Sequence, residues 1–202
     1  MIETKRKIIL SEGVPVSITD RTGNVVDTKA LIGRANKQFD NTVSLETHRR
    51  GQFLPDVVVD SGFIVANSTS LEEYLTIAVY PEVVRGQLVS RVSHMFVCNC
   101  TVDIRGIVET ATPSGQIKRQ DVVKMAGQKA YVQALSGDLK QYEAGLHEDA
   151  EYRVFAPVTD VSLLDKLIIH FDSFVIPLKI VHLNFLTYSG IVVIQACSET
   201  RK

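Results

Sequence analysis

The sequence contains no run approaching the roughly 20 apolar residues that a membrane-spanning helix needs. Its start, MIETKRKIIL, has too few apolar residues for the ~7–15-residue hydrophobic region of a secretory signal. We therefore expect a soluble protein without a membrane partner. The glycines also form neither G-x-x-x-x-G-K-[ST] nor G-x-G-x-x-G, so the sequence offers no phosphate-cradling loop for nucleotide chemistry.

Cysteine is scarce, and its three positions are Cys98, Cys100 and Cys197. If Cys98 and Cys100 share a strand, they lie about 6.6 Å apart along it, a spacing that suits a disulfide poorly. A reducing compartment is the natural expectation. His94 would share their face, but thiolates on one zinc ion must lie within roughly 4 Å of each other, so buried small side chains are favoured over a metal site.

No catalytic motif accompanies the histidines and cysteines. A thiol nucleophile would need Cys98 or Cys197 beside His170 or His182, yet the sequence has no G-x-S-x-G elbow and no cysteine-protease signature. The sequence therefore predicts that the protein is not an enzyme and that it has no cofactor and no bound metal. A cysteine-dependent hydrolase is the most distant of the alternatives.

Net charge is also nearly absent, because 22 basic residues face 23 acidic ones and leave a formal charge of −1. This balance argues against a protein that binds polyanions over its whole surface. Short basic segments are still present, the clearest being His48–Gly51 and the stretch that begins at Lys118.

What the sequence does contain is β pattern. The 45% of apolar and 22% of charged residues are typical of a globular protein, and 202 residues suffice for one large or two small domains. Runs of strand length, rich in β-branched residues, end the chain at Leu167–Phe171, Leu178–Phe185 and Ile191–Ala196. Near the start, Ile8–Leu10 and Val14–Ile18 also look like strands.

An earlier part of the chain follows the same order. Three pairs of segments correspond, with identical spacing between the first two: Gly62–Val65 with Asp165–Ile168, Leu75–Val79 with Leu178–His182, and Gly86–Val89 with Gly190–Val193. This indicates two β units of similar plan, although any two β meanders share some of this rhythm.

We therefore predict a mainly β fold of two small antiparallel β-barrels or β-sandwiches with little helix. The first domain is expected at residues 1–110 and the second at 128–202. Between them, residues 111–127 are predicted to form a connector, because Pro113, Ser114 and Gly115 are turn or linker residues.

The second unit carries Asp165–Ile169, Leu178–Val181 and Gly190–Gln195 and stops at Glu199, Thr200 and Arg201. Preceded by a first β unit and a Pro/Gly-bearing connector, this order resembles the small β-barrel neck proteins of tailed bacteriophages, the head-tail connector, stopper or head-completion group. The match covers about residues 60 to 105 and 128 to 202. It implies a structural virion protein, made in the bacterial host cytoplasm, that forms a ring between portal and tail.

On this resemblance the partners are copies of the chain itself, other neck, portal or tail proteins, and DNA passing transiently through the lumen. The predicted interface or lumen loops are His48, Arg49, Arg50 and Gly51, and Lys118, Arg119, Gln120 and Asp121. A tail-terminator, tail-tube or baseplate component would share this framework. A nucleic-acid-binding β-barrel module is the alternative from another class.

Overall fold

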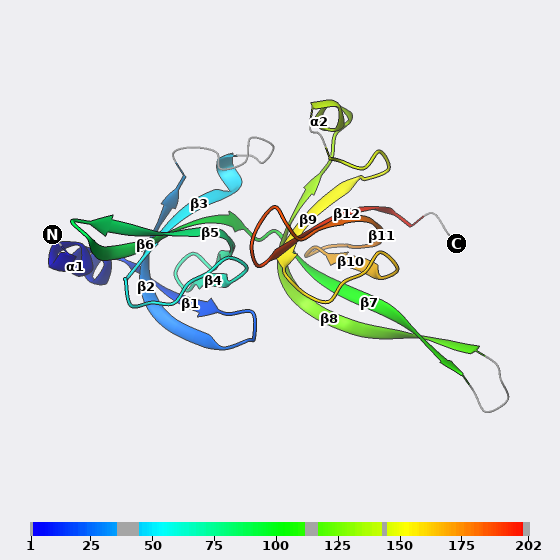
Figure 1. Cartoon of the computed structure of the whole chain (residues 1–202), viewed down its shortest axis with the longest axis horizontal. Helices are drawn as coiled ribbons and strands as arrows, with labels where there is room; N and C mark the ends of the chain where they lie inside the picture. The colour runs from blue at the N-terminus through cyan, green and yellow to red at the C-terminus, as the bar shows by residue number, and fades with distance from the viewer. Residues whose placement is uncertain (1, 36–44, 112–116, 143–144, 200–202) are drawn as a thin grey trace. The chain divides into compact units, whose positions relative to one another are not determined.

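The computed structural model describes residues 2–35, 45–111, 117–142 and 145–199 (Figure 1). The chain divides into two compact units: unit 1 is Met1–Cys98 with Phe185–Ile191, and unit 2 is Asn99–Asn184 with Val192–Lys202. Within the described residues each unit is built on one closed antiparallel barrel of six strands. The predicted mainly β fold with little helix is therefore confirmed, and both units are barrels.

Barrel 1 closes in the order β1-β2-β3-β6-β5-β4. Alternating strand residues point inward, and the core contains Val16, Ile18, Phe53, Tyr74 and Met95. Its elements are α1 (Ile2–Glu12), β1 (Val14–Thr19), β2 (Val25–Arg34), the 3₁₀ helix η1 (Leu45–Thr47), β3 (His48–Phe53), β4 (Ile64–Asn67), β5 (Glu73–Val84) and β6 (Gln87–Val97).

Barrel 2 closes in the order β10-β11-β12-β9-β8-β7 around a core that includes Val102, Ile104, Val154, Leu167 and Ile180. Burial alternates along β10, as expected for a strand with one face inside a barrel. The elements are β7 (Cys100–Ala111), β8 (Ile117–Ala134), α2 (Gly137–Tyr142), β9 (Tyr152–Pro157), β10 (Lys166–His170), β11 (Val175–Asn184) and β12 (Ile191–Ser198).

The two barrels share one topology. Followed from β7, the ring of barrel 2 runs β7-β8-β9-β12-β11-β10, which is the order β1-β2-β3-β6-β5-β4 of barrel 1. Strands β1–β6 therefore correspond in order to β7–β12. The segment pairs that match in sequence fall on β4 and β10, β5 and β11, and β6 and β12. The predicted repeat is therefore confirmed at the level of equivalent strands.

The predicted domain boundary and connector are corrected. The units divide between Cys98 and Asn99, not near residue 110, and Ile117–Gly127 belongs to β8, which pairs with β7. Turn-forming residues mark the ends of hairpins as well as the linkers between domains, and local composition does not distinguish the two. Pro113, Ser114 and Gly115 themselves lie outside the described residues.

The predicted strand at Ile8–Leu10 is also wrong, because these residues belong to α1. Ile9 is fully buried, whereas its neighbours Ile8 and Leu10 are exposed. The helix end is held in place where Gly13 N donates to Ile9 O at 3.0 Å and Lys29 Nζ donates to Leu10 O at 2.8 Å. Three consecutive apolar residues are compatible with the period of a helix and with that of a strand. Contacts with the barrel therefore decide that this segment is helical.

Candidate interaction site

The hairpin of β7 and β8 extends past the barrel it belongs to (Figure 1). β10 pairs with β7 only over Thr101–Arg105, and β9 pairs with β8 only over Tyr131–Ala134. We call the remainder, Gly106–Ala111 and Ile117–Gly127, the arm. Among the described residues its strands pair only with each other, so an unpaired row of backbone groups lies along each side.

Barrel closure does not require the arm. The equivalent hairpin of barrel 1 has strands of 6 and 10 residues, whereas β7 and β8 have 12 and 18. Ile107, Ile117, Val122 and Val123 of the arm are 45%, 67%, 41% and 54% exposed. Long unpaired strands with exposed apolar side chains are templates for pairing with another chain.

An ion pair fixes the base of the arm. Lys124 Nζ lies 2.9 Å from Asp165 Oδ2 and 3.8 Å from Asp160 Oδ2, and Ser162 N also donates to Asp165 Oδ2 at 2.7 Å. The Asp165 side chain is 4% exposed, and its hydrogen bond raises the pKa of Lys124 above its ordinary value. Gly106 leaves the space for this pair, since a Cβ there would lie 2.6 Å from Lys124 Cε.

A second polar contact joins the arm to the barrel wall. Asp103 accepts hydrogen bonds from Gly127 N at 2.8 Å and, through its other oxygen, contacts His170 Nε2 at 2.9 Å. Burial alone would raise the pKa of Asp103, but the Gly127 N–H and His170 outweigh it and lower that pKa. The hairpin therefore leaves the barrel from a base held by two carboxylates.

The first predicted loop, His48–Gly51, is corrected to strand β3. His48 is fully buried with its ring edge-on to Phe96, 4.8 Å between centroids. Gly51 is buried as well, and Arg49 forms an ion pair with Glu72 at 3.3 Å. Successive side chains of a strand point to opposite faces, so the basic residues of this segment do not form one surface. Within the segment, Arg50 is the exposed cation.

The second predicted loop, Lys118–Asp121, is corrected to strand β8, where it pairs with Ile107–Thr110 of β7. It therefore lies on the arm, and Gln120 and Asp121 are exposed. The interface role assigned to both segments stays a prediction.

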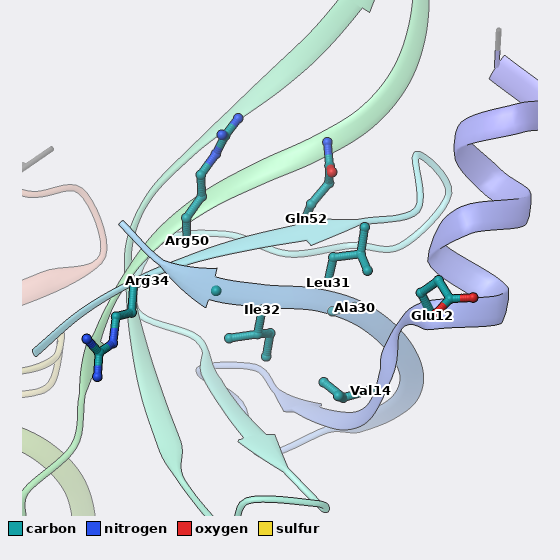
Figure 2. A pocket seen from close by; sticks show the side chains of 9 residues that line it. Glu12, Val14, Ala30, Leu31, Ile32, Arg34, Arg50 and Gln52 are labelled. Atoms are coloured by element: carbon teal, nitrogen blue, oxygen red, sulfur yellow. The ribbon is translucent and has the colours of Figure 1, made fainter. Parts of the chain in front are cut away.

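Unit 1 contains a pocket of about 320 Å³ that sequence pattern did not predict (Figure 2). β1 pairs with β2 only as far as Val14, which lies opposite Ala30. Beyond that point Leu31–Arg34 of β2 continues, paired with β3 on one side and with no described strand on the other. We call Leu31–Arg34 the open β2 edge. The lining residues are Glu12, Val14, Ala30, Leu31, Ile32, Gly33, Arg34, Arg50 and Gln52.

Hydrogen-bond alternation shows which backbone groups face the open side. Asp20 N donates to Asn24 O at 2.9 Å, and the register from there is regular, so even-numbered residues of β2 direct their N–H and C=O toward β1. Ile32 and Arg34 continue this alternation past the start of β1. The open edge therefore presents two backbone donors and two acceptors.

The side chains beside this edge differ in character. Figure 2 shows Leu31, Arg50 and Gln52 projecting to one side of β2 and β3. Gly33 lies opposite Arg50 in the register, and a Cβ at Gly33 would meet nothing within 4 Å. Burial first, and then the charge of Arg50, lower the pKa of His94, so this neighbouring imidazole stays neutral at pH 7. The pocket thus combines a backbone edge, apolar side chains and two exposed guanidinium groups, those of Arg34 and Arg50.

The cysteines lie elsewhere. β6 ends at Val97 and β7 begins at Cys100, so the expectation that Cys98 and Cys100 share one strand is wrong. Burial raises the pKa of Cys100 to about 12, which leaves almost no thiolate at neutral pH. Within the described ranges, no group of three or more His, Cys, Asp or Glu side chains could hold a metal ion.

In the part of the chain that the structure covers, no helix has the length and apolar character needed to cross a membrane.

Comparison with known proteins provides no family. No protein-family model matches the chain, and no curated protein matches it. Among solved structures, a K. pneumonia MrkH–c-di-GMP complex aligns at 11% identity over 100% of this chain and 86% of that one, with a TM-score of 0.25. A similarity this weak carries no argument about fold or ligand.

Proposed function

We propose that the protein is a structural subunit that forms rings with copies of itself, as a neck component of a tailed-bacteriophage virion. The observation that supports this best is the arm, which is longer than barrel closure needs and whose two edges pair with no other strand that the structure describes. Exposed apolar residues on a two-stranded hairpin are costly unless another surface covers them. A subunit interface would provide that surface.

Ring formation follows from the kind of contact that an arm makes. An arm that binds a different surface of the next subunit makes a heterologous contact, and repeated heterologous contacts close into rings. The formal net charge of −1 would let DNA pass the lumen without a tight phosphate grip. Portal and tail proteins are the other proposed partners, and a tail-terminator, tail-tube or baseplate role would use the same assembly.

The test is the mass and symmetry of the full chain, purified and virion-bound, by light scattering, native mass spectrometry and electron microscopy. We expect ring particles, and we expect Ile107→Glu with Val123→Glu to abolish them because charge would replace the exposed apolar side chains. Val58→Glu, at an exposed apolar position outside the strands, is the control and should leave the rings intact. A chain that stays monomeric in every setting would refute the proposal.

The nucleic-acid-binding alternative predicts salt-dependent binding to single-stranded DNA at low protein concentration. Fluorescence anisotropy with a labelled oligonucleotide at low and high salt would measure it. Tight binding by a monomer would favour the alternative over a ring subunit, whereas absence of binding would remove it.

A further inference from the structure

We infer that the open β2 edge of one copy binds the arm of a second copy as an added β-strand. This inference rests on the proposed ring-forming function and names the two surfaces that meet. The open β2 edge lacks a partner strand on one side among the described residues, and the arm has strand edges without partners. Strand addition would satisfy both sets of backbone groups.

The backbone of the open β2 edge favours such a strand. Ile32 and Arg34 direct their N–H and C=O groups into the pocket, and the next residue in the position of β1 is Gly13, whose N–H is used by Ile9 O. An added strand would continue the line of β1 along β2. Main-chain hydrogen bonds would supply affinity, and side chains on either side would supply specificity.

The backbone of the arm sets the register. Phe171 N donates to Phe174 O, and the alternation that continues through β10 and β7 turns the even-numbered residues of β7 toward β8. Gly106 therefore makes a hydrogen-bonded pair with Val122, and the flanking Asp121 and Val123 direct their backbone groups to the open side of β8.

The side chains fit when Ile32 lies opposite Val123 in an antiparallel register. Val123, 54% exposed alone, then gains an apolar neighbour, and Asp121 lies opposite Arg34. Apolar cross-strand pairs of this kind stabilise sheets.

Charge identifies the arm as the occupant. Arg34 and Asp121 are both exposed, and in this register they lie directly opposite each other. An arginine and a carboxylate at facing positions of two strands give the contact a defined alignment.

The two surfaces also belong to different parts of the chain, since the open β2 edge lies in unit 1 and the arm in unit 2. The contact is therefore heterologous, and each copy offers one arm and one edge to its neighbours. Pairing between two arms would instead be self-complementary and would stop at a dimer.

The first test uses two variants on the full chain, each blocking one half of the contact. Arg34→Glu reverses the charge of the open β2 edge, and Asp121→Arg reverses the charge of the arm. Each should weaken self-association by about tenfold or more, because the two facing residues then carry like charges. Arg85→Glu, at an exposed arginine outside the strands, is the matched control and should assemble like the wild type.

Mixing the two variants separates this inference from simple misfolding. An Arg34→Glu copy keeps its arm and an Asp121→Arg copy keeps its edge, so the mixture brings opposite charges together at each contact between unlike copies and should associate about as tightly as the wild type. A mixture that associates no more tightly than either variant alone, or a variant that associates like the wild type, would overturn the inference while leaving ring assembly intact. A wild-type chain that never assembles would instead refute the proposed function on which it rests.

The register has its own test by disulfide formation between copies. Because Ile32 and Arg34 make the hydrogen-bonded pairs, Gly33 would form a non-hydrogen-bonded pair with Val122, with Cα atoms about 4.5 Å apart, within reach of a disulfide. A Gly33→Cys copy mixed with a Val122→Cys copy should cross-link on oxidation. Gly33→Cys mixed with Val123→Cys places the thiols on opposite faces and should not; equal yields would contradict the register.

Discussion

The ion pair at the base of the arm should behave asymmetrically when its partners are removed one at a time. Lys124 Nζ and Asp165 Oδ2 are 2.9 Å apart, and their side chains are 28% and 4% exposed. Replacing Lys124 by Met keeps most of the apolar stem over Gly106 but leaves a buried carboxylate without its cation. Replacing Asp165 by Asn leaves a lysine that can still turn toward water.

The magnitude follows from the burial of each group. At 2.9 Å the attraction is about 6 kcal/mol with an effective dielectric constant of about 20, before the cost of desolvation is subtracted. Breaking a fully buried pair from one side costs about 3–5 kcal/mol. Because Lys124 is partly solvated, we expect Lys124→Met to lower the free energy of unfolding by about 2–3 kcal/mol and Asp165→Asn by about 1 kcal/mol.

The double variant is the decisive measurement. Once Asp165 is Asn, its buried charge is gone, so Lys124→Met with Asp165→Asn should be about 1 kcal/mol more stable than Lys124→Met alone. Urea unfolding followed by circular dichroism would give the free energies, and amide hydrogen exchange would assign the transition to barrel 2. Lys166→Met removes a more exposed ion pair with Glu199 in the same barrel and should cost less than about 1 kcal/mol.

A double variant no more stable than Lys124→Met would refute this reasoning. Lys124 would then stabilise the arm through the packing of its methylene groups over Gly106, and the charge of Asp165 would contribute nothing to the base of the arm.

Three further predictions concern the barrels and the thiols. Leu167→Ala should lower the free energy of unfolding by about 2–5 kcal/mol because the side chain is fully buried, whereas Leu164→Ala, at 84% exposure, should change it by less than about 0.5 kcal/mol in urea titrations. Hydrogen bonds from Asn24 and Thr22 lower the pKa of Asp20 to about 2, so its contribution to stability is present above the unfolded value of 3.8 and is lost as pH falls toward 2; Asp20→Asn should remove this part of the acid dependence in thermal melts. Cys100 should react with iodoacetamide more slowly than Cys197 in the folded protein and equally fast after unfolding, as mass spectrometry of the peptides would show.

Local sequence pattern was sufficient for most of the strands and for the repeat. β-branched runs bounded by turn residues predicted β10, β11 and β12, because the alternation of side chains along a strand is a short-range property. The same pattern upstream predicted equivalent strands, and the common ring order of the barrels is what such a repeat requires. The helix α1 was missed, since Ile8–Leu10 is too short a run to fix a period.

The candidate site could not be predicted from the sequence, for a different reason. Lys118–Asp121 read as loop because Pro113 and Gly115 precede it, and only the pairing with β7 shows that it is part of a long hairpin. His48–Gly51 read as one basic surface, whereas burial of His48 and Gly51 leaves Arg50 as its exposed cation.

The sequence by itself thus determined that the chain is β-rich, repeated and nearly neutral, because composition and alternation are local quantities. Only the tertiary structure decided where one barrel ends, how far the arm extends and which part of β2 has no neighbour. Those properties depend on which strands pair and where each pairing stops, and strand pairing joins residues that are far apart in the sequence.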